Sequence, residues 1–75
     1  MDESTWVQRF ATALATEPPD EAEKAALLSL ASVAANASER IAAPISCWIV
    51  AKSGRSPEEA LAVARELASA HGAGS

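Results

Sequence analysis

This chain has little cysteine, glycine or aromatic residue. Its 75 residues include one cysteine, three glycines, two tryptophans, one phenylalanine and no tyrosine. A lone cysteine, Cys47, excludes an internal disulfide bond. It also suits a reducing compartment, so we expect a cytoplasmic protein. With few aromatic residues and 19 alanines, the composition favours helix and disfavours strand.

Basic residues and long apolar runs are also scarce. Six Lys and Arg stand against ten Asp and Glu, giving a net charge of −4, which opposes a general affinity for nucleic acid. No uncharged stretch reaches the roughly 20 residues of a membrane span. The opening MDESTW has no basic segment before an apolar run, so we expect no signal peptide. This length indicates one domain with a thin core.

The apolar periodicity predicts an all-α bundle of four helices within one domain, residues 1–75. The helices are expected at about 4–15, 20–41, 44–53 and 57–70, with residues 71–75 as a frayed tail and His71 solvated or capping the last helix. The breaks fall at TEPPD, AAP and SGRSP. Asp20 with Glu23 and Ser56 with Glu59 predict capping boxes, although Pro18 or Pro19 is an alternative first turn for the second helix.

The stretch RIAAPISCWIVAKSG, residues 40–54, contains no acid and is apolar nearly all round. It predicts a short third helix, begun by Pro44, that lies inside the bundle against a long central second helix. Trp48 is then expected to be mostly buried, at a cost of about 3–5 kcal/mol when replaced by Ala. Cys47 is expected to be a small core residue.

No catalytic or metal-binding pattern is evident. Cys47 and His71 are too few for a zinc site, and the carboxylates of Glu58 and Glu59 are explained by the start of a helix. No glycine-rich phosphate loop occurs. The segment around Gly54 has a helix-turn-helix outline, but Glu58 and Glu59 would face the DNA and repel its phosphates. We therefore expect no enzyme activity, no cofactor, no metal, no nucleic acid and no membrane contact.

Charge is distributed unevenly along the chain. The first 23 residues hold six acids and one base, whereas residues 40–55 hold three bases and no acid. Solvated corners explain this pattern, and a patch that binds an anion or a protein partner is the alternative. The candidate binding residues are Arg40, Pro44, Ser46, Trp48, Lys52 and Arg55. A homodimer is a further possibility, because a core this thin is not expected to cover Leu28, Val33, Cys47 and Val50.

A short signature resembles a known family. Arg40, Ala43, Pro44, Ile45, Ser46, Trp48 and Ile49 match the pattern Arg-x-x-Ala-Pro-(Leu/Ile)-(Ser/Thr)-x-aromatic-(Leu/Ile), and Trp6 is a usual companion in the first helix. This pattern is similar to that of a bacterial all-helical domain family of unknown function. Members of that family are found fused to, or encoded beside, the MobA-like nucleotidyltransferase of molybdenum cofactor synthesis.

The resemblance covers about Trp6 to Ala68 and excludes the transferase domain itself. It implies a small non-catalytic interaction or accessory module linked to synthesis of the molybdopterin guanine dinucleotide cofactor. The implied partner is a molybdenum cofactor nucleotidyltransferase. The alternative function is a domain that binds a small anionic ligand at the corner formed by Arg40, Pro44 and Ser46.

Overall fold

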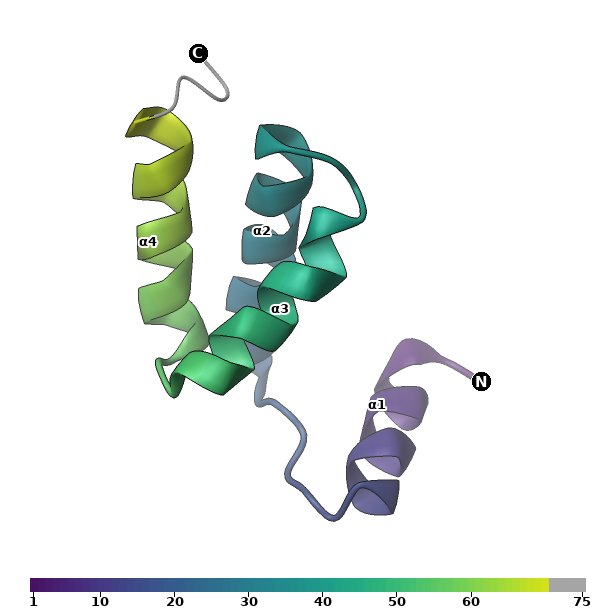
Figure 1. The fold of residues 1–75 in the computed structure, drawn as a ribbon. Helices are drawn as coiled ribbons and strands as arrows, with labels where there is room; N and C mark the ends of the chain where they lie inside the picture. The colour runs from purple at the N-terminus through teal and green to yellow at the C-terminus, as the bar shows by residue number, and fades with distance from the viewer. Residues whose placement is uncertain (71–75) are drawn as a thin grey trace.

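The second helix, α2 (Glu21–Ala37), is the element against which two others pack. The computed structural model describes residues 1–70. In it, α3 (Ala42–Ser53) crosses α2, and α4 (Pro57–Ala70) runs beside α2 (Figure 1). The expectation of a central second helix with more than one neighbour is confirmed, and so are the all-α class and the four helices.

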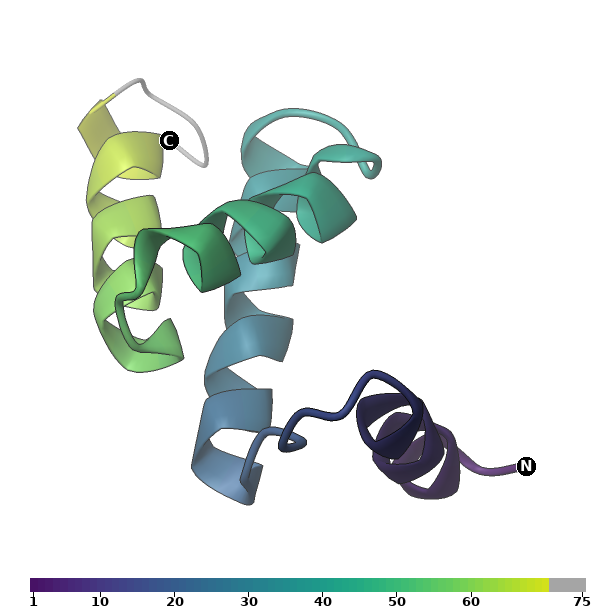
Figure 2. The same cartoon turned by 60° about the horizontal axis from the view of Figure 1, so that its bottom comes forward.

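The first helix, α1 (Glu3–Ala13), lies apart from the other three. No other helix packs on it as α3 and α4 pack on α2, and it lies to one side of the start of α2 in both views (Figure 2). Its link to α2 is an ion pair between Glu3 and Lys24. The radius of gyration is 13.1 Å, compared with about 11 Å for a compact chain of this length, because α1 extends the molecule.

Local side-chain caps fix where α2 and α4 begin. Asp20 accepts a hydrogen bond from the Glu23 backbone N–H at 2.7 Å, and the Glu23 carboxylate accepts from the Asp20 N–H at 2.9 Å. Ser56 and Glu59 form the same reciprocal pair at 3.1 and 3.2 Å. Both predicted capping boxes are confirmed, and α4 has the predicted bounds because each box satisfies backbone donors that a helix start leaves free.

The break between α2 and α3 comes earlier than predicted. Helix α2 ends at Ala37 instead of 41, and α3 begins at Ala42 instead of Pro44. Ser38 leaves the helical conformation, with a φ of −136° and a ψ of −103°, and its N–H donates to the Ala34 carbonyl at 3.0 Å. The turn lies at residues 38–41, and the N–H groups of Ala42 and Ala43 bond to carbonyls within it, those of Glu39 and Arg40, before Pro44 is reached. Pro44 still occupies the first turn of α3.

The core is smaller than the periodicity predicted. Within residues 1–70, only Ala11, Ala26, Leu30 and Val50 form the buried apolar core. The expectation of a buried Trp48 is wrong, since 65 % of this residue is exposed. The expectation that α3 lies inside the bundle is wrong too. It contacts its neighbours through one side only and leaves these large side chains in solvent: Ile45, Trp48 and Ile49.

The large apolar residues of α1 and α4 are also poorly covered. Trp6, Phe10 and Leu14 are 50–60 % exposed, and Val63 and Leu67 are 49 % and 60 % exposed. The large apolar residues on α1, α3 and α4 are thus only partly covered by neighbouring helices. The physical reason is that alanine dominates the contact faces. Such short side chains let backbones approach but leave the bulkier neighbours standing outside the contact.

Two residues in left-handed backbone conformation end helices. Ala15 has a φ of 55°. The N–H groups of Ala15 and Thr16 donate to the carbonyls of Thr12 and Ala11 at 3.0 and 2.9 Å, which is a Schellman motif. Gly54, with a φ of 75°, ends α3 as predicted. At Ala15 the sequence places a Cβ where glycine is usual, at a cost of about 1 kcal/mol.

Substitutions at Ala15 and Gly54 should change stability in opposite directions. Ala15→Gly should stabilise α1 by about 0.5–1 kcal/mol, seen as slower amide hydrogen exchange within α1. Gly54→Ala should lower the free energy of unfolding by about 1 kcal/mol in urea titrations. A Cβ at Gly54 would meet no atom within 4 Å, so the loss would come from the backbone alone. Faster exchange in Ala15→Gly would contradict the expectation.

Candidate functional site

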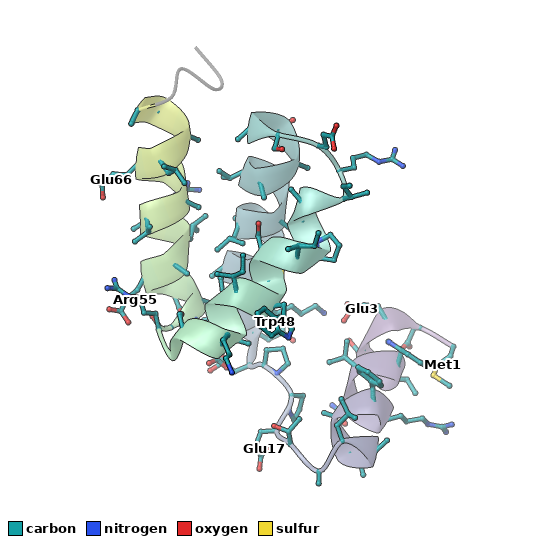
Figure 3. All side chains as sticks on the ribbon, in the orientation of Figure 1. Met1, Glu3, Glu17, Trp48, Arg55 and Glu66 are labelled. Carbon is teal, nitrogen blue, oxygen red and sulfur yellow. The ribbon has the colours of Figure 1, made fainter. Side chains whose placement is uncertain are left out.

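The exposed side of α3 carries a continuous stripe of side chains. Ile41, Ile45, Trp48 and Lys52 are spaced by four, three and four residues, so they line one side of the helix. All four are exposed. Trp48 lies on the side of α3 away from α4 (Figure 3). We call these four residues the α3 stripe. The spacing matches the seam with which one helix packs on another.

A second surface lies between the helices that pack together. It is a groove of about 540 Å³, formed by α2, α3 and α4. We call it the α3–α4 groove, and its lining is mostly apolar: Leu30, Ala34, Ser46, Ile49, Val50, Ser53, Arg55, Ala60, Val63, Ala64 and Leu67. The deepest side chains are Leu30 and Val50, whereas Ile49, Val63 and Leu67 stand at its open edge.

The six predicted site residues do not gather in one place. Trp48 and Lys52 belong to the α3 stripe, and Ser46 and Arg55 line the groove, with Arg55 at the corner between α3 and α4 (Figure 3). Pro44 is exposed. It is two residues before Ser46, so the two side chains point about 200° apart around the helix axis. Arg40 is exposed in the turn before α3.

The start of α3 has few donors left for an anion. The N–H of Ala42 donates to the Glu39 carbonyl at 2.9 Å, and that of Ala43 donates to the Arg40 carbonyl at 3.1 Å. Pro44 has no N–H. A helix N-terminus attracts anions through its free N–H groups, and here the first three positions offer none. This geometry weighs against the anion-binding corner.

The sequence interpretation missed the residues at the groove edge and on α1. None of Ile49, Val63, Leu67, Trp6 and Phe10 was among the candidate site residues. The rings of Trp6 and Phe10 stack with centroids 5.5 Å apart. The one signal that pointed to them was the surplus of large apolar residues over what a short chain can enclose. Of the four residues proposed as uncovered flanks, Leu28 is exposed, Val33 and Cys47 are partly buried and Val50 is buried.

Within residues 1–70, no three His, Cys, Asp or Glu side chains lie close enough together to hold a metal ion. His71 lies outside the described residues, as does the predicted tail. None of the helices in the described part of the chain combines the length and apolar character that crossing a bilayer requires.

Residues 2–75 match the model of a family described as a domain of unknown function, DUF6457. The chain belongs to this family. No curated protein and no solved structure matches it. The expectation of a family of unknown function is thus confirmed, whereas the family match does not extend to a nucleotidyltransferase.

Carboxylates that cap helices have lowered pKa values. The Thr5 backbone N–H donates to Asp2 at 2.8 Å and lowers the pKa of that carboxyl. The Ser56 N–H and hydroxyl lower the pKa of Glu59 below its ordinary value in the same way. A lowered pKa in the folded state adds stability above the ordinary value of about 4.3, and that stability is lost as the pH falls through the folded-state pKa.

This predicts a pH dependence that one substitution reduces. From neutral pH to about pH 3, the melting temperature should fall, and it should fall less in Glu59→Gln. Glutamine keeps an oxygen acceptor for Ser56 but does not titrate. Glu58→Gln removes one negative charge from the same turn and is the matched control. Equal pH slopes in Glu59→Gln and the wild type would show that the capping carboxylate is not involved.

The exposure of Trp48 predicts a modest loss of stability on truncation. Trp48→Ala should lower the free energy of unfolding by about 1–2 kcal/mol, in proportion to the area it buries. Leu30→Ala, at 3 % exposure, should cost about 2–5 kcal/mol. Urea titrations of both variants measure the difference. If Trp48→Ala is as costly as Leu30→Ala, the tryptophan packs as a core residue in solution.

Proposed function

We propose that this DUF6457 domain is a non-catalytic interaction module whose α3 stripe docks against an amphipathic helix of a partner protein. The observation that carries the proposal is the exposure of Ile41, Ile45 and Trp48, at 67, 57 and 65 %, on one line along α3. A monomer gains nothing by holding three large apolar side chains in water. Contiguous apolar surface of this kind is typical of protein interfaces.

The stripe has the composition of an interface centre. Tryptophan is enriched among the residues that dominate binding energy, because it removes a large apolar area from water. Ile45 lies within one turn of Trp48 and would flank it. Lys52 continues the line beyond Trp48, so the partner helix is expected to place an acidic residue opposite it. Helix-in-groove binding with anchors at these spacings is a common recognition mode.

The partner we propose is a molybdenum cofactor nucleotidyltransferase. Its support is the resemblance of the signature from Arg40 to Ile49. A partner can reach most of the signature without unfolding the domain, because five of its seven residues are exposed: Arg40, Pro44, Ile45, Trp48 and Ile49. The lone cysteine supports a cytoplasmic location for this pair.

Titration of such a transferase with the fluorescently labelled domain tests the proposal. Trp48→Ala should weaken binding about tenfold or more, since loss of an anchor costs at least about 1.4 kcal/mol. Leu28→Ala is the matched control: Leu28 is 64 % exposed and belongs to neither the stripe nor the groove. Equal affinities of the two variants would reject the α3 stripe as the docking surface.

A second titration addresses the alternative ligand. GTP and inorganic phosphate are added while backbone amide shifts are followed. We expect no shifts confined to Arg40–Ser46, because the first-turn donors of α3 are already bonded. Shifts restricted to that segment would favour the anion-binding corner over the protein partner.

A further inference from the structure

Helix α1 and the α3–α4 groove are complementary halves of one contact, and each chain carries both. Trp6, Phe10 and Leu14 are four residues apart and form a ridge about 12 Å long on α1. All three are at least half exposed. The groove has an apolar floor at Leu30 and Val50 and open apolar edges. We infer that two copies of this chain form a symmetric dimer in which each α1 ridge seats in the groove of the other copy.

Side-chain spacing supports the fit. Val63 and Leu67 are four residues apart on α4, so they form a ridge of the same kind as the one on α1. Ile49 stands across the groove from them, on α3. Ridges of this spacing pack into the grooves beside one another in the commonest class of helix contact. The concave surface therefore has the right chemistry and repeat to accept a helix, rather than a small polar ligand.

The way α1 is held explains why the groove of its own chain is not the expected acceptor. Glu3 pairs with Lys24 near the start of α2, and a small cleft is formed there by Val7, Pro18 and Pro19. Val7 lies beside the ridge on α1, so these contacts border it, and Trp6, Phe10 and Leu14 still remain at least half exposed. Docking into a second copy preserves them, whereas folding back onto the same chain would break them.

The area involved suits a dimer. Half of an aromatic side chain is about 100 Å², and each copy offers six apolar side chains that are about half exposed or more, three on α1 and three at the groove edge. Reciprocal docking would remove about 1,000 Å² or more from water, which reaches the size of a specific interface. It would also enlarge a core that has four buried residues within the described part of each chain.

This dimer is independent of the partner proposed above, since it uses the groove and α1 and leaves the α3 stripe free. A two-fold axis closes the assembly, so the contact does not propagate into filaments. Small domains need stabilisation beyond their thin cores, and a dimer supplies here what disulfide bonds supply in other small domains.

Sedimentation equilibrium from low to high micromolar concentration tests the inference. The wild type should be a dimer, and Trp6→Glu and Leu67→Lys should each raise the dissociation constant about tenfold or more. Both positions are exposed in the monomer, and far-UV circular dichroism checks that helix content is retained. Trp6→Ala is the milder second variant. Leu28→Glu and Leu28→Lys introduce the same charges outside the contact and should leave the dimer intact.

Mixing the two variants gives the sharpest result. A Trp6→Glu chain keeps a normal groove and a Leu67→Lys chain keeps a normal α1, so the mixture restores one native contact. In the other contact the new carboxylate meets the new ammonium group. The mixture should therefore dimerise more tightly than either variant alone. A mixture as weak as its components would overturn the inference, and so would a Leu28 variant that dissociates equally.

Fluorescence separates a second copy from other occupants. In a Trp48→Phe background Trp6 is the only tryptophan, and its emission should shift to the blue as the protein concentration rises. A wild type that stays monomeric throughout overturns the inference. In that case, blue-shifted emission that does not change with concentration would mean that α1 covers its own chain's groove, and red-shifted emission that both surfaces are free. Trp48→Ala should leave the dimer unchanged, so failure of the partner proposal and failure of this one are distinguishable.

Discussion

The contact of α2 with both α3 and α4 determines the rest of the structure. Leu30, on α2, is 3 % exposed and also forms the floor of the groove between the other two helices. Because alanine supplies much of the surrounding surface, the backbones come close together while few large side chains are enclosed. The same choice of residue that permits the packing limits how much apolar area it buries, and it leaves two apolar surfaces for other molecules.

Those two surfaces differ in shape, and we proposed a different binding role for each on that basis. The α3 stripe is convex and ends in a cation, which suits a helix supplied by another protein. The groove is concave and apolar, with α1 as the matching convex element in the same chain. The two proposals therefore use separate surfaces of one small acidic domain, one for a second copy and one for a partner.

Much of the secondary structure could be predicted because its signals are local. The capping boxes at Asp20 and Ser56, the left-handed Gly54 and the proline-rich breaks each act within a few residues, so the four helices followed from the sequence. The end of α2 could not be placed as well. It lies at Ser38, in a segment (residues 35–43) that contains neither proline nor glycine, so no local signal marks it.

Burial was the weaker prediction because it depends on how helices are paired in space. An arc containing Trp6 and Phe10 looks the same in sequence whether it meets its own bundle or another chain. Trp48 was assigned to the core because its helix is apolar all round. In the fold only one side of that helix meets α2, and Trp48 is 65 % exposed. The apolar pattern therefore predicted a helix but not which of its side chains face a neighbour.

The order of the helices has a consequence for folding speed. The elements that pack, α2, α3 and α4, follow one another along the chain with short turns between them. Contacts between neighbouring segments need little loop closure, and helical proteins of this kind fold in microseconds to milliseconds. Rapid folding limits the time for which a nascent chain exposes its whole apolar content. For a protein whose native surface keeps so many large apolar side chains in water, rapid folding limits the chance of aggregation.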